Sequence, residues 1–293
     1  MLNGIIVLDK SEGVSSAFLV GRVKHILKEY NSTENFKVGH FGTLDPFASG
    51  VLPIALGRAT RLFKYHLANT KQYYARFYFG KETNTLDTEG IIIKESSIIP
   101  NITEIQKAIK SFIGNSSQKP PLFSANSING VRAYKLARAG IDFDLGEKEI
   151  KILSFDLIKQ VSNNEFDFRI VCSSGTYIRS ICRDLAAMLG SVGHINMLRR
   201  ESSGIFKLEN AIKIIELNSN NILSYLNPLE LCVPQFDSID IDSASLKDLM
   251  DGKKVVFMGQ NQLNTKKIVK NNNKIVAICT LDNGILSPDT WLI

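Results

Sequence analysis

The sequence lacks the short motifs that mark several large enzyme classes. It contains no GxxxxGK(S/T) phosphate-binding loop, no HExxH zinc motif and no GxSxG nucleophile turn. No cluster of cysteine and histidine has the spacing of metal ligands, and the four histidines are isolated from one another in the sequence. These absences argue against ATP hydrolysis and against a structural zinc site, and we expect no bound metal.

Cysteine and long apolar runs are also scarce. The four cysteines show neither a CxxC pair nor the spacing of a small disulfide-bonded domain, so we interpret them as reduced thiols. The apolar run at residues 4–8 is too short for a signal peptide, and no later run approaches the roughly 20 residues of a membrane span. We therefore expect a cytoplasmic protein with no membrane partner.

Acidic residues are missing from three long windows of the sequence, residues 46–81, 105–141 and 252–281, whose charged residues are all lysine or arginine. The formal net charge of the 293-residue chain is +6. A surface that follows RNA phosphates would require acids to be kept away from long basic stretches in this way. Lysines scattered over a solvated surface would give the same pattern, but we favour a nucleic-acid partner.

A chain of this length is expected to fold into one large and one small domain. Residues 4–8 and 72–79 have the pattern of strands, and residues 15–27 have the pattern of a helix with Ser15 or Ser16 at its N-cap. Prolines and a cluster of aspartates between residues 228 and 251 indicate a boundary. We predict domains over residues 1–235 and 236–293, the second a small all-β module.

The segment from Gln118 to Gly140 interrupts this pattern. It contains consecutive prolines at 120 and 121, a glycine at 130 and a short basic helix that includes Arg132 and Tyr134. We predict that this segment forms a protruding arm, inserted into the large domain at about residues 118–150.

The strongest sign of an active site is the stretch Gly39–Gly50, which places Asp45 among glycines between two apolar runs. Glycine permits a positive φ and a close approach to a ligand, and Pro46 holds Asp45 out of a helix. A surface turn would have the same composition. A second candidate, Arg179, lies where a strand turns into a helix. If the two residues meet, the guanidinium would keep the carboxylate ionised and oriented.

Several segments together resemble the bacterial tRNA pseudouridine-55 synthase family, in order and at compatible spacing over about residues 4–206. The resemblance implies an α+β fold with a mixed, mainly antiparallel central sheet, flanking helices and an arm that grips RNA. The C-terminal module resembles a PUA-type RNA-binding domain by position, size and β character. The segments are the Asp45 loop, Lys71–Tyr73, Gly80–Gly90, Ser124–Ala125, Arg132–Tyr134, Cys172–Arg179 and Met197–Arg200.

The resemblance also implies a reaction. Members of the family detach uracil from C1′ of a uridine in the TΨC arm of tRNA, turn the base and rejoin it through C5, without a cofactor. The catalytic carboxylate then falls on Asp45. Tyr73 is expected to stack on the base and to help move the C5 proton, and Arg179 to orient the carboxylate. A carboxylate can stabilise positive character at C1′ electrostatically or trap it covalently, and the sequence leaves this choice open.

Further residues match binding positions of the family. His40 matches a histidine that fills the space left by the flipped base, and Leu198 matches an apolar residue that bounds the uracil pocket. Lys10 is expected to support the pocket, and Arg132 and Tyr134 to bind the RNA.

The sequence departs from the family pattern at Ser11, Ser127 and Ser174, where proline, lysine and lysine are frequent. The last two positions lose positive charge where RNA should lie. The departures therefore concern RNA affinity and substrate range rather than the chemical step.

Three alternatives remain at this stage. A synthase guided by a separate RNA would share the motifs, although the arm favours a stand-alone enzyme that needs no guide RNA. In a non-catalytic tRNA-binding or RNA-folding protein, the Asp45 loop would be scaffold only. An RNA methyltransferase would need a glycine-rich cofactor loop after a strand, which the sequence lacks. We expect a monomer that acts on the TΨC stem-loop of tRNA.

Overall fold

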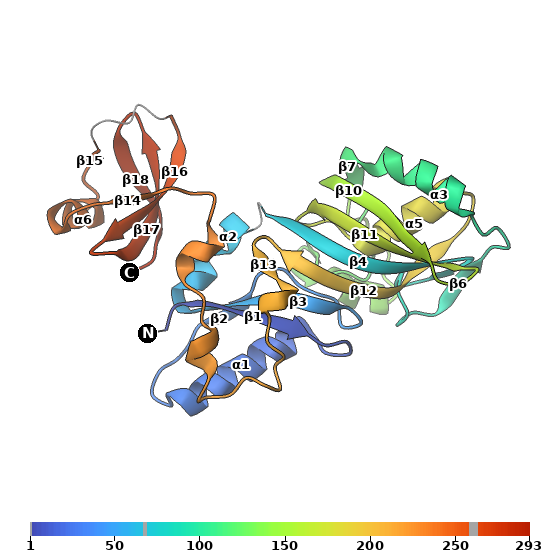
Figure 1. Cartoon of the computed structure of the whole chain (residues 1–293), viewed down its shortest axis with the longest axis horizontal. Coiled ribbons are helices and arrows are strands. Elements are labelled where there is room, and N and C mark those ends of the chain that lie inside the picture. The colour runs from blue at the N-terminus through green and yellow to red at the C-terminus, as the bar shows by residue number, and fades with distance from the viewer. Residues whose placement is uncertain (1, 67–68, 258–262) are drawn as a thin grey trace.

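The computed structural model describes residues 2–66, 69–257 and 263–293. Figure 1 shows a long central sheet and a smaller sheet at the C-terminal end, set apart from the first. The central sheet has nine strands and the C-terminal sheet five, and two further sheets have two strands each. No helix in these ranges is both long enough and apolar enough to span a membrane.

The central sheet is mixed and mainly antiparallel, as the sequence predicts. Its main path runs β1-β3-β12-β4-β11-β10-β7, with β2 beside β3 and β13 beside β12. Strands β3 and β12 run parallel, whereas the other described neighbours are antiparallel. The strands are Gly4–Lys10 (β1), Val38–His40 (β2), Ser49–Leu56 (β3), Thr70–Phe79 (β4), Gly114–Gln118 (β7), Lys148–Gln160 (β10), Glu165–Ser173 (β11), Gly193–Ser203 (β12) and Phe206–Lys207 (β13).

Two helices cover separate parts of this sheet. Helix α1 (Ser16–Tyr30) places Leu19, Val23 and Ile26 in one core with the apolar residues of β1 and β3, and it ends at Tyr30 rather than at residue 27 as predicted. Its N-cap is Ser15, whose hydroxyl accepts a hydrogen bond from the Phe18 amide (3.1 Å). Helix α5 (Ile178–Met188) packs on β4 and β12. Besides α4 and α6, which are described below, the other helical segments in the described part of the chain are η1 (Gly57–Leu62), α2 (Phe63–His66), α3 (Ile102–Ala108), η2 (Ile109–Phe112), η3 (Leu208–Asn210), η4 (Ile222–Tyr225) and η5 (Leu229–Cys232).

Strand β4 carries two of the residues that line the candidate site described below. Its side chains alternate between a buried and a half-exposed face, because successive residues of a strand point to opposite sides. The buried face begins with Lys71 and Tyr73 and continues into the aromatic core through Phe77 and Phe79. Tyr73 pairs with Ile170 of β11 on one side and with Arg200 of β12 on the other. Lys71 and Tyr73 are therefore neighbours on one face, anchored in the middle of the sheet.

The predicted arm leaves and re-enters the sheet between β7 and β10, which pair through Gln118 and Lys148. It contains a short hairpin, β8 (Ser127–Ile128) and β9 (Val131–Arg132), and the helix α4 (Ala133–Arg138). Arg132 lies at the N-cap of α4 rather than inside the helix. A second hairpin, β5 (Lys81–Thr83) and β6 (Ile92–Glu95), flanks the polar turn between Thr83 and Gly90.

The C-terminal region forms its own five-stranded sheet with the order β14-β16-β17-β18-β15. It also carries the helix α6 (Ser243–Met250), which the sequence analysis missed. The sheet docks on η1 and α2: Arg61 donates a hydrogen bond to the Trp291 carbonyl (2.7 Å), and the Tyr65 hydroxyl lies 2.9 Å from Thr290 Oγ1. The strands are Ser238–Asp240 (β14), Val255–Val256 (β15), Thr265–Asn271 (β16), Lys274–Asp282 (β17) and Ile285–Trp291 (β18).

The three basic windows of the sequence do not form acid-free surfaces. Arg76, in the first window, pairs with the buried Asp167 (2.7 Å), and Lys266, in the third, pairs with Asp289 (2.7 Å). The fold brings in acids from other segments. Further pairs of this kind join Lys119 to Asp144, Lys267 to Asp237 and Lys270 to Glu230. These cations are partly neutralised within the fold, and contact between the windows and RNA stays a prediction.

Candidate active site

The loop that carries Asp45, residues 41–48, is fixed from two sides. The hydroxyl of Ser16 donates a hydrogen bond to the Leu44 carbonyl (2.9 Å) and accepts one from the Leu44 amide (3.0 Å). The guanidinium of the fully buried Arg200 donates to the carbonyls of Gly42 (3.0 Å) and Val51 (2.7 Å). Because these bonds hold the backbone on both sides of Asp45, the position of its carboxylate is set by α1 and β12 together.

Lys10 holds the far end of the same loop. Its buried ammonium donates to the carbonyls of Ser11 (3.0 Å) and Pro46 (3.0 Å), and also to the carbonyl of Ala48. Burial lowers the pKa of Lys10 to about 8. Lys10 is not among the described residues that line the two cavities below. The structure thus places it beneath the Asp45 loop, where the resemblance implied support of the pocket.

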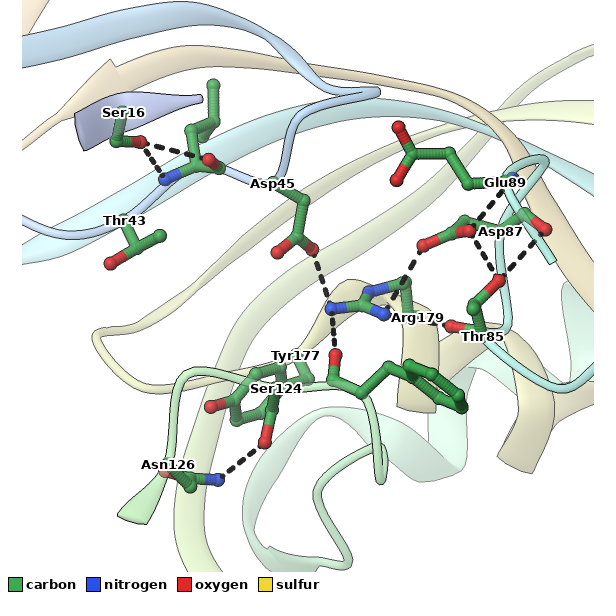
Figure 2. A network of polar contacts seen from close by, with 12 residues as sticks. Ser16, Thr43, Asp45, Thr85, Asp87, Glu89, Ser124, Asn126, Tyr177 and Arg179 are labelled. Atoms are coloured by element: carbon green, nitrogen blue, oxygen red, sulfur yellow. Dashed lines mark hydrogen bonds and ion pairs between the residues drawn. The ribbon is translucent and has the colours of Figure 1, made fainter. Parts of the chain in front are cut away.

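Arg179 lies in the first turn of α5 and connects this helix to three other segments: the Asp45 loop, the turn that carries Asp87, and the arm (Figure 2). Its Nη2 atom lies 2.8 Å from Asp45 Oδ2, and its Nη1 atom lies 3.3 Å from Asp87 Oδ2. It also donates to the carbonyls of Thr85 (2.8 Å) and Phe123 (3.0 Å). The predicted meeting of Asp45 and Arg179 is confirmed. The Arg179 side chain is 4% exposed and that of Asp45 is 32% exposed, so the carboxylate stays accessible while its partner is fixed.

Asp87 is a part of this arrangement that sequence reasoning missed. It is buried, and burial raises the pKa of its carboxyl group. Its Oδ1 atom accepts hydrogen bonds from the Thr85 hydroxyl (2.5 Å) and the Glu89 amide (3.0 Å), as Figure 2 shows. The resemblance included the segment Gly80–Gly90 without a role for Asp87, and no local pattern places this turn beside Arg179.

Four predicted residues line one cavity of about 330 Å³, which we call the first cavity: Asp45, Tyr73, Arg179 and Leu198. This volume lies at the lower end of the range for small-molecule sites and suits one nucleobase. Tyr73 is buried, which raises the pKa of its phenol to about 12. Leu198 is buried as well. Lys71, Lys148, Thr176 and Tyr177 also line the first cavity and had no role assigned from the sequence.

Three further predicted residues line a larger neighbouring cavity of about 770 Å³, the second cavity. His40 comes from β2, and Arg132 and Tyr134 come from the arm. Burial lowers the pKa of His40, and its Nδ1 atom is buried without a hydrogen-bond partner among the described residues. Asp45 and Arg179 line both cavities, so they stand where the two meet.

The chemistry available here is that of a carboxylate held by a buried guanidinium beside a small, partly apolar cavity. Such a carboxylate can stabilise positive charge on a bound sugar or attack it. In the described part of the chain, no group of histidine, cysteine, aspartate or glutamate could hold a metal ion.

Comparison with known proteins identifies the family. The model of the TruB family pseudouridylate synthase (N terminal domain) matches residues 25–178, and the tRNA pseudouridylate synthase B C-terminal domain matches residues 179–232. A relative named tRNA pseudouridine synthase B from Ehrlichia ruminantium (strain Gardel) is 39% identical over 97% of each chain. One of the same name from Lactobacillus acidophilus is 33% identical over 100% of this chain and 99% of its own.

Solved structures show the same fold at lower identity. A chain in a Cbf5-Nop10-Gar1 complex has a TM-score of 0.73 and 24% identity, over 99% of this chain and 85% of its own. A chain in an H/ACA RNP bound to a substrate RNA containing 2′-deoxyuridine has a TM-score of 0.72 and 22% identity over the same shares. With two family models that cover most of its length and relatives above 30% identity, this chain belongs to the TruB family of pseudouridylate synthases.

Proposed function

We propose that the protein is a stand-alone enzyme that converts the uridine at position 55, in the TΨC loop of tRNA, to pseudouridine. The observation that carries the proposal is the Asp45 carboxylate, held 2.8 Å from Arg179 at the edge of a cavity large enough for one base. The relatives named tRNA pseudouridine synthase B support tRNA as the substrate. We propose that the reaction needs no cofactor, metal or guide RNA.

In the proposed reaction the C1′–N1 bond of uridine breaks and its electron pair leaves with the base. Asp45 then stabilises the positive character at C1′, either electrostatically or by a transient covalent bond. Arg179 holds the attacking or stabilising oxygen in place through its contacts with Asp45 and Asp87. The base turns, C5 bonds to C1′, the C5 proton leaves and N1 gains a proton, so the product is an isomer of the substrate.

Tyr73 and Leu198 would hold the detached uracil in the first cavity. Both are buried in the sheet, on β4 and β12, and a flat base fits between an aromatic ring and an aliphatic side chain. Because burial raises the pKa of Tyr73 to about 12, its phenol stays protonated at neutral pH. We therefore assign Tyr73 to binding of the base, and its phenolate is a minor species.

The second cavity would receive the RNA around the target nucleotide. A stacked base hides C1′ and C5 from a carboxylate, so the target must flip out, which costs a few kcal/mol. His40 would fill the space that the base leaves, and Arg132 and Tyr134 would hold the strand from the arm. We propose that Lys10 acts indirectly, because two of its three hydrogen bonds reach carbonyls of the Asp45 loop and fix it in place.

We further propose that residues 1–235 form the catalytic domain and residues 236–293 a PUA-like RNA-binding module, and that the protein acts as a cytoplasmic monomer. The separate C-terminal sheet supports this division.

One experiment tests both the proposed activity and the proposed position of the modified uridine. Purified protein is mixed with an unmodified tRNA transcript that carries tritium at C5 of its uridines, without guide RNA, cofactor or metal. We expect one equivalent of tritium to be released per tRNA, and none from a matched transcript with cytidine at position 55. Release that requires an added guide RNA would favour a ribonucleoprotein enzyme. Tight binding without release in either case would favour a non-catalytic RNA-binding role.

A further inference from the structure

Lys71 places a charged group in the first cavity, and although it belongs to one of the segments that carry the resemblance, no role has been given to it above. It is the second residue of β4 and shares the buried face of that strand with Tyr73. The residue is 7% exposed and lines the first cavity. In the ranges that the structure describes, its ammonium has no hydrogen-bond or ion-pair partner. The ammonium therefore keeps contact with the open space of the first cavity and has no described partner of opposite charge there, so it can bind a ligand in the cavity.

The groups around Lys71 do not neutralise it. Arg200 of β12 is itself cationic, and its donors are directed at carbonyls of the Asp45 loop and β3. Cys172 of β11 is buried, which raises the pKa of its thiol to about 11. His40 of β2 and His66 of α2 face Lys71 as well, and burial lowers the pKa of each. Burial and Arg200 together lower the pKa of Lys71 to about 8, so most of it remains charged at neutral pH.

Lys10 provides an internal comparison. It is as deeply buried, and burial likewise lowers its pKa to about 8. Three backbone carbonyls nevertheless accept hydrogen bonds from its ammonium. Lys10 therefore has a complete structural role, whereas the donors of Lys71 remain free to meet a molecule in the cavity.

The backbone opposite Lys71 leaves room for its ammonium. Gly42 has φ +91°, and a Cβ atom built on it would lie 2.8 Å from Lys71 Nζ. A side chain at position 42 would thus be strained and would push the ammonium away. Glycine at this position lets Lys71 reach the cavity wall next to the loop that carries Asp45.

We propose that the Lys71 ammonium donates a hydrogen bond to a ring carbonyl oxygen of the uracil in the first cavity and stabilises the negative charge of the detached base. This inference rests on the proposed function. When the C1′–N1 bond breaks, its electron pair leaves with N1 and the charge spreads to the carbonyl oxygens of the ring. A fixed cation beside these oxygens favours the separated state over the intact nucleotide. Lys71 keeps its proton throughout, and the C5 and N1 protons move as described above.

The placement favours the base over an RNA phosphate as the ligand. Lys71 lines the smaller cavity with Tyr73 and Leu198 and is not among the described residues that line the second cavity, where Arg132 and Tyr134 of the arm lie. With C1′ at Asp45, the base is the part of the nucleotide that extends toward β4. Lys71 would then act on the step that breaks the bond, with little effect on capture of the tRNA.

The test compares wild-type protein with Lys71→Met and Lys10→Met in three measurements: the single-turnover rate of tritium release, the affinity for tRNA, and Tm. For Lys71→Met we expect a rate at least about 100-fold lower, an affinity within about threefold of wild type, and a higher Tm because an unpaired buried charge is gone. Lys10→Met should lower Tm, since three carbonyls lose their donor. A merely structural lysine would not combine a slower reaction with a more stable fold.

Three outcomes would overturn the proposal for Lys71. These are a wild-type rate in Lys71→Met, a loss of tRNA affinity without a loss of rate, which would indicate a phosphate contact, and a fall in both rate and Tm, which would indicate a structural role. Failure of the proposed function itself looks different, because the wild-type protein would then release no tritium.

Discussion

The Nη2 atom of Arg179 lies 2.8 Å from the Oδ2 atom of Asp45, although the two residues are far apart in the chain. The side chain of Arg179 is almost completely buried and meets Asp87 on its other side. A guanidinium held between two carboxylates has both of its terminal nitrogen atoms fixed in direction. We therefore propose that Arg179 places the Asp45 carboxylate rather than binding RNA.

Replacing Arg179 with lysine tests this placement. Arg179→Lys keeps the positive charge but loses the planar fork that reaches Asp45, Asp87 and two carbonyls. We expect the single-turnover rate to fall about 100-fold, because displacement of a reacting group by about 1 Å has an effect of this size. The matched control is Arg183→Lys, on the next turn of α5 and paired with Asp184, which should leave the rate unchanged. Equal rates for both variants would contradict the assignment.

A substitution at Gly50 tests how closely the backbones of β3 and β12 pack beneath the site. Its φ is +107°, and a Cβ atom on it would lie 2.2 Å from the Arg200 carbonyl oxygen. Gly50→Ala should lower the free energy of unfolding by more than about 3 kcal/mol through strain and a backbone clash. Gly13 also has a positive φ, +80°, but has nothing within 4 Å of that position, so Gly13→Ala should cost only about 1 to 2 kcal/mol. Urea denaturation measures the free energy of unfolding of both variants. Similar losses would show that the backbone moves to relieve the clash at Gly50, which would contradict the prediction.

Because His66 is buried, we predict that acid lowers the free energy of unfolding. Burial lowers the pKa of His66 to about 4, and its ring is packed against Phe41 and Phe206. The unfolded chain binds a proton near pH 6.5 and the folded chain only near pH 4, so the free energy of unfolding falls as the pH drops through this range. Between pH 7 and 4.5 the wild type should lose about 2 kcal/mol more than His66→Gln. The control His25→Gln, at an exposed residue, should follow the wild type.

Arg132 tests the contribution of the arm to RNA binding. It lines the second cavity and lies on the surface of the arm. If it contacts a phosphate, Arg132→Ala should weaken tRNA binding and reduce the slope of log affinity against log salt by about 1. Lys107→Ala on α3, outside the described lining of both cavities, is the control. An unchanged salt slope with Arg132→Ala would mean that this side chain serves the hairpin, where it donates to the Ala125 carbonyl.

The parts of the site that the sequence could predict are those with a strong local signal. The glycines and the Asp-Pro pair mark the Asp45 loop, and the strand-to-helix turn marks Arg179, whereas Tyr73 was singled out by the resemblance alone. The resemblance joined these signals into one site, and the Asp45–Arg179 contact is confirmed. The roles given to these residues remain predictions.

The parts that could not be predicted depend on which distant segments pack together. Asp87 meets Arg179 only because the turn after β5 packs beside α5, and no periodicity in the sequence encodes that contact. Lys71 looks like one of several cations in a basic window, yet the register of β4 buries it. In the same window Arg76 pairs with the buried Asp167 of β11, a contact that the charge pattern of the sequence does not indicate. Helix α6 was missed because it is short and lies among aspartates, which were interpreted as a domain boundary.

The most direct test of the account is the single-turnover release of tritium from tRNA labelled at C5 of uridine, by wild-type protein and by Asp45→Asn, without guide RNA. Asparagine keeps the shape of the side chain but can neither balance positive charge at C1′ nor attack it. We predict prompt release by the wild type and a rate at least about 1,000-fold lower for Asp45→Asn, with tRNA affinity within a few-fold of wild type. Release by Asp45→Asn at a rate close to that of the wild type would contradict the central claim that Asp45 carries the reaction.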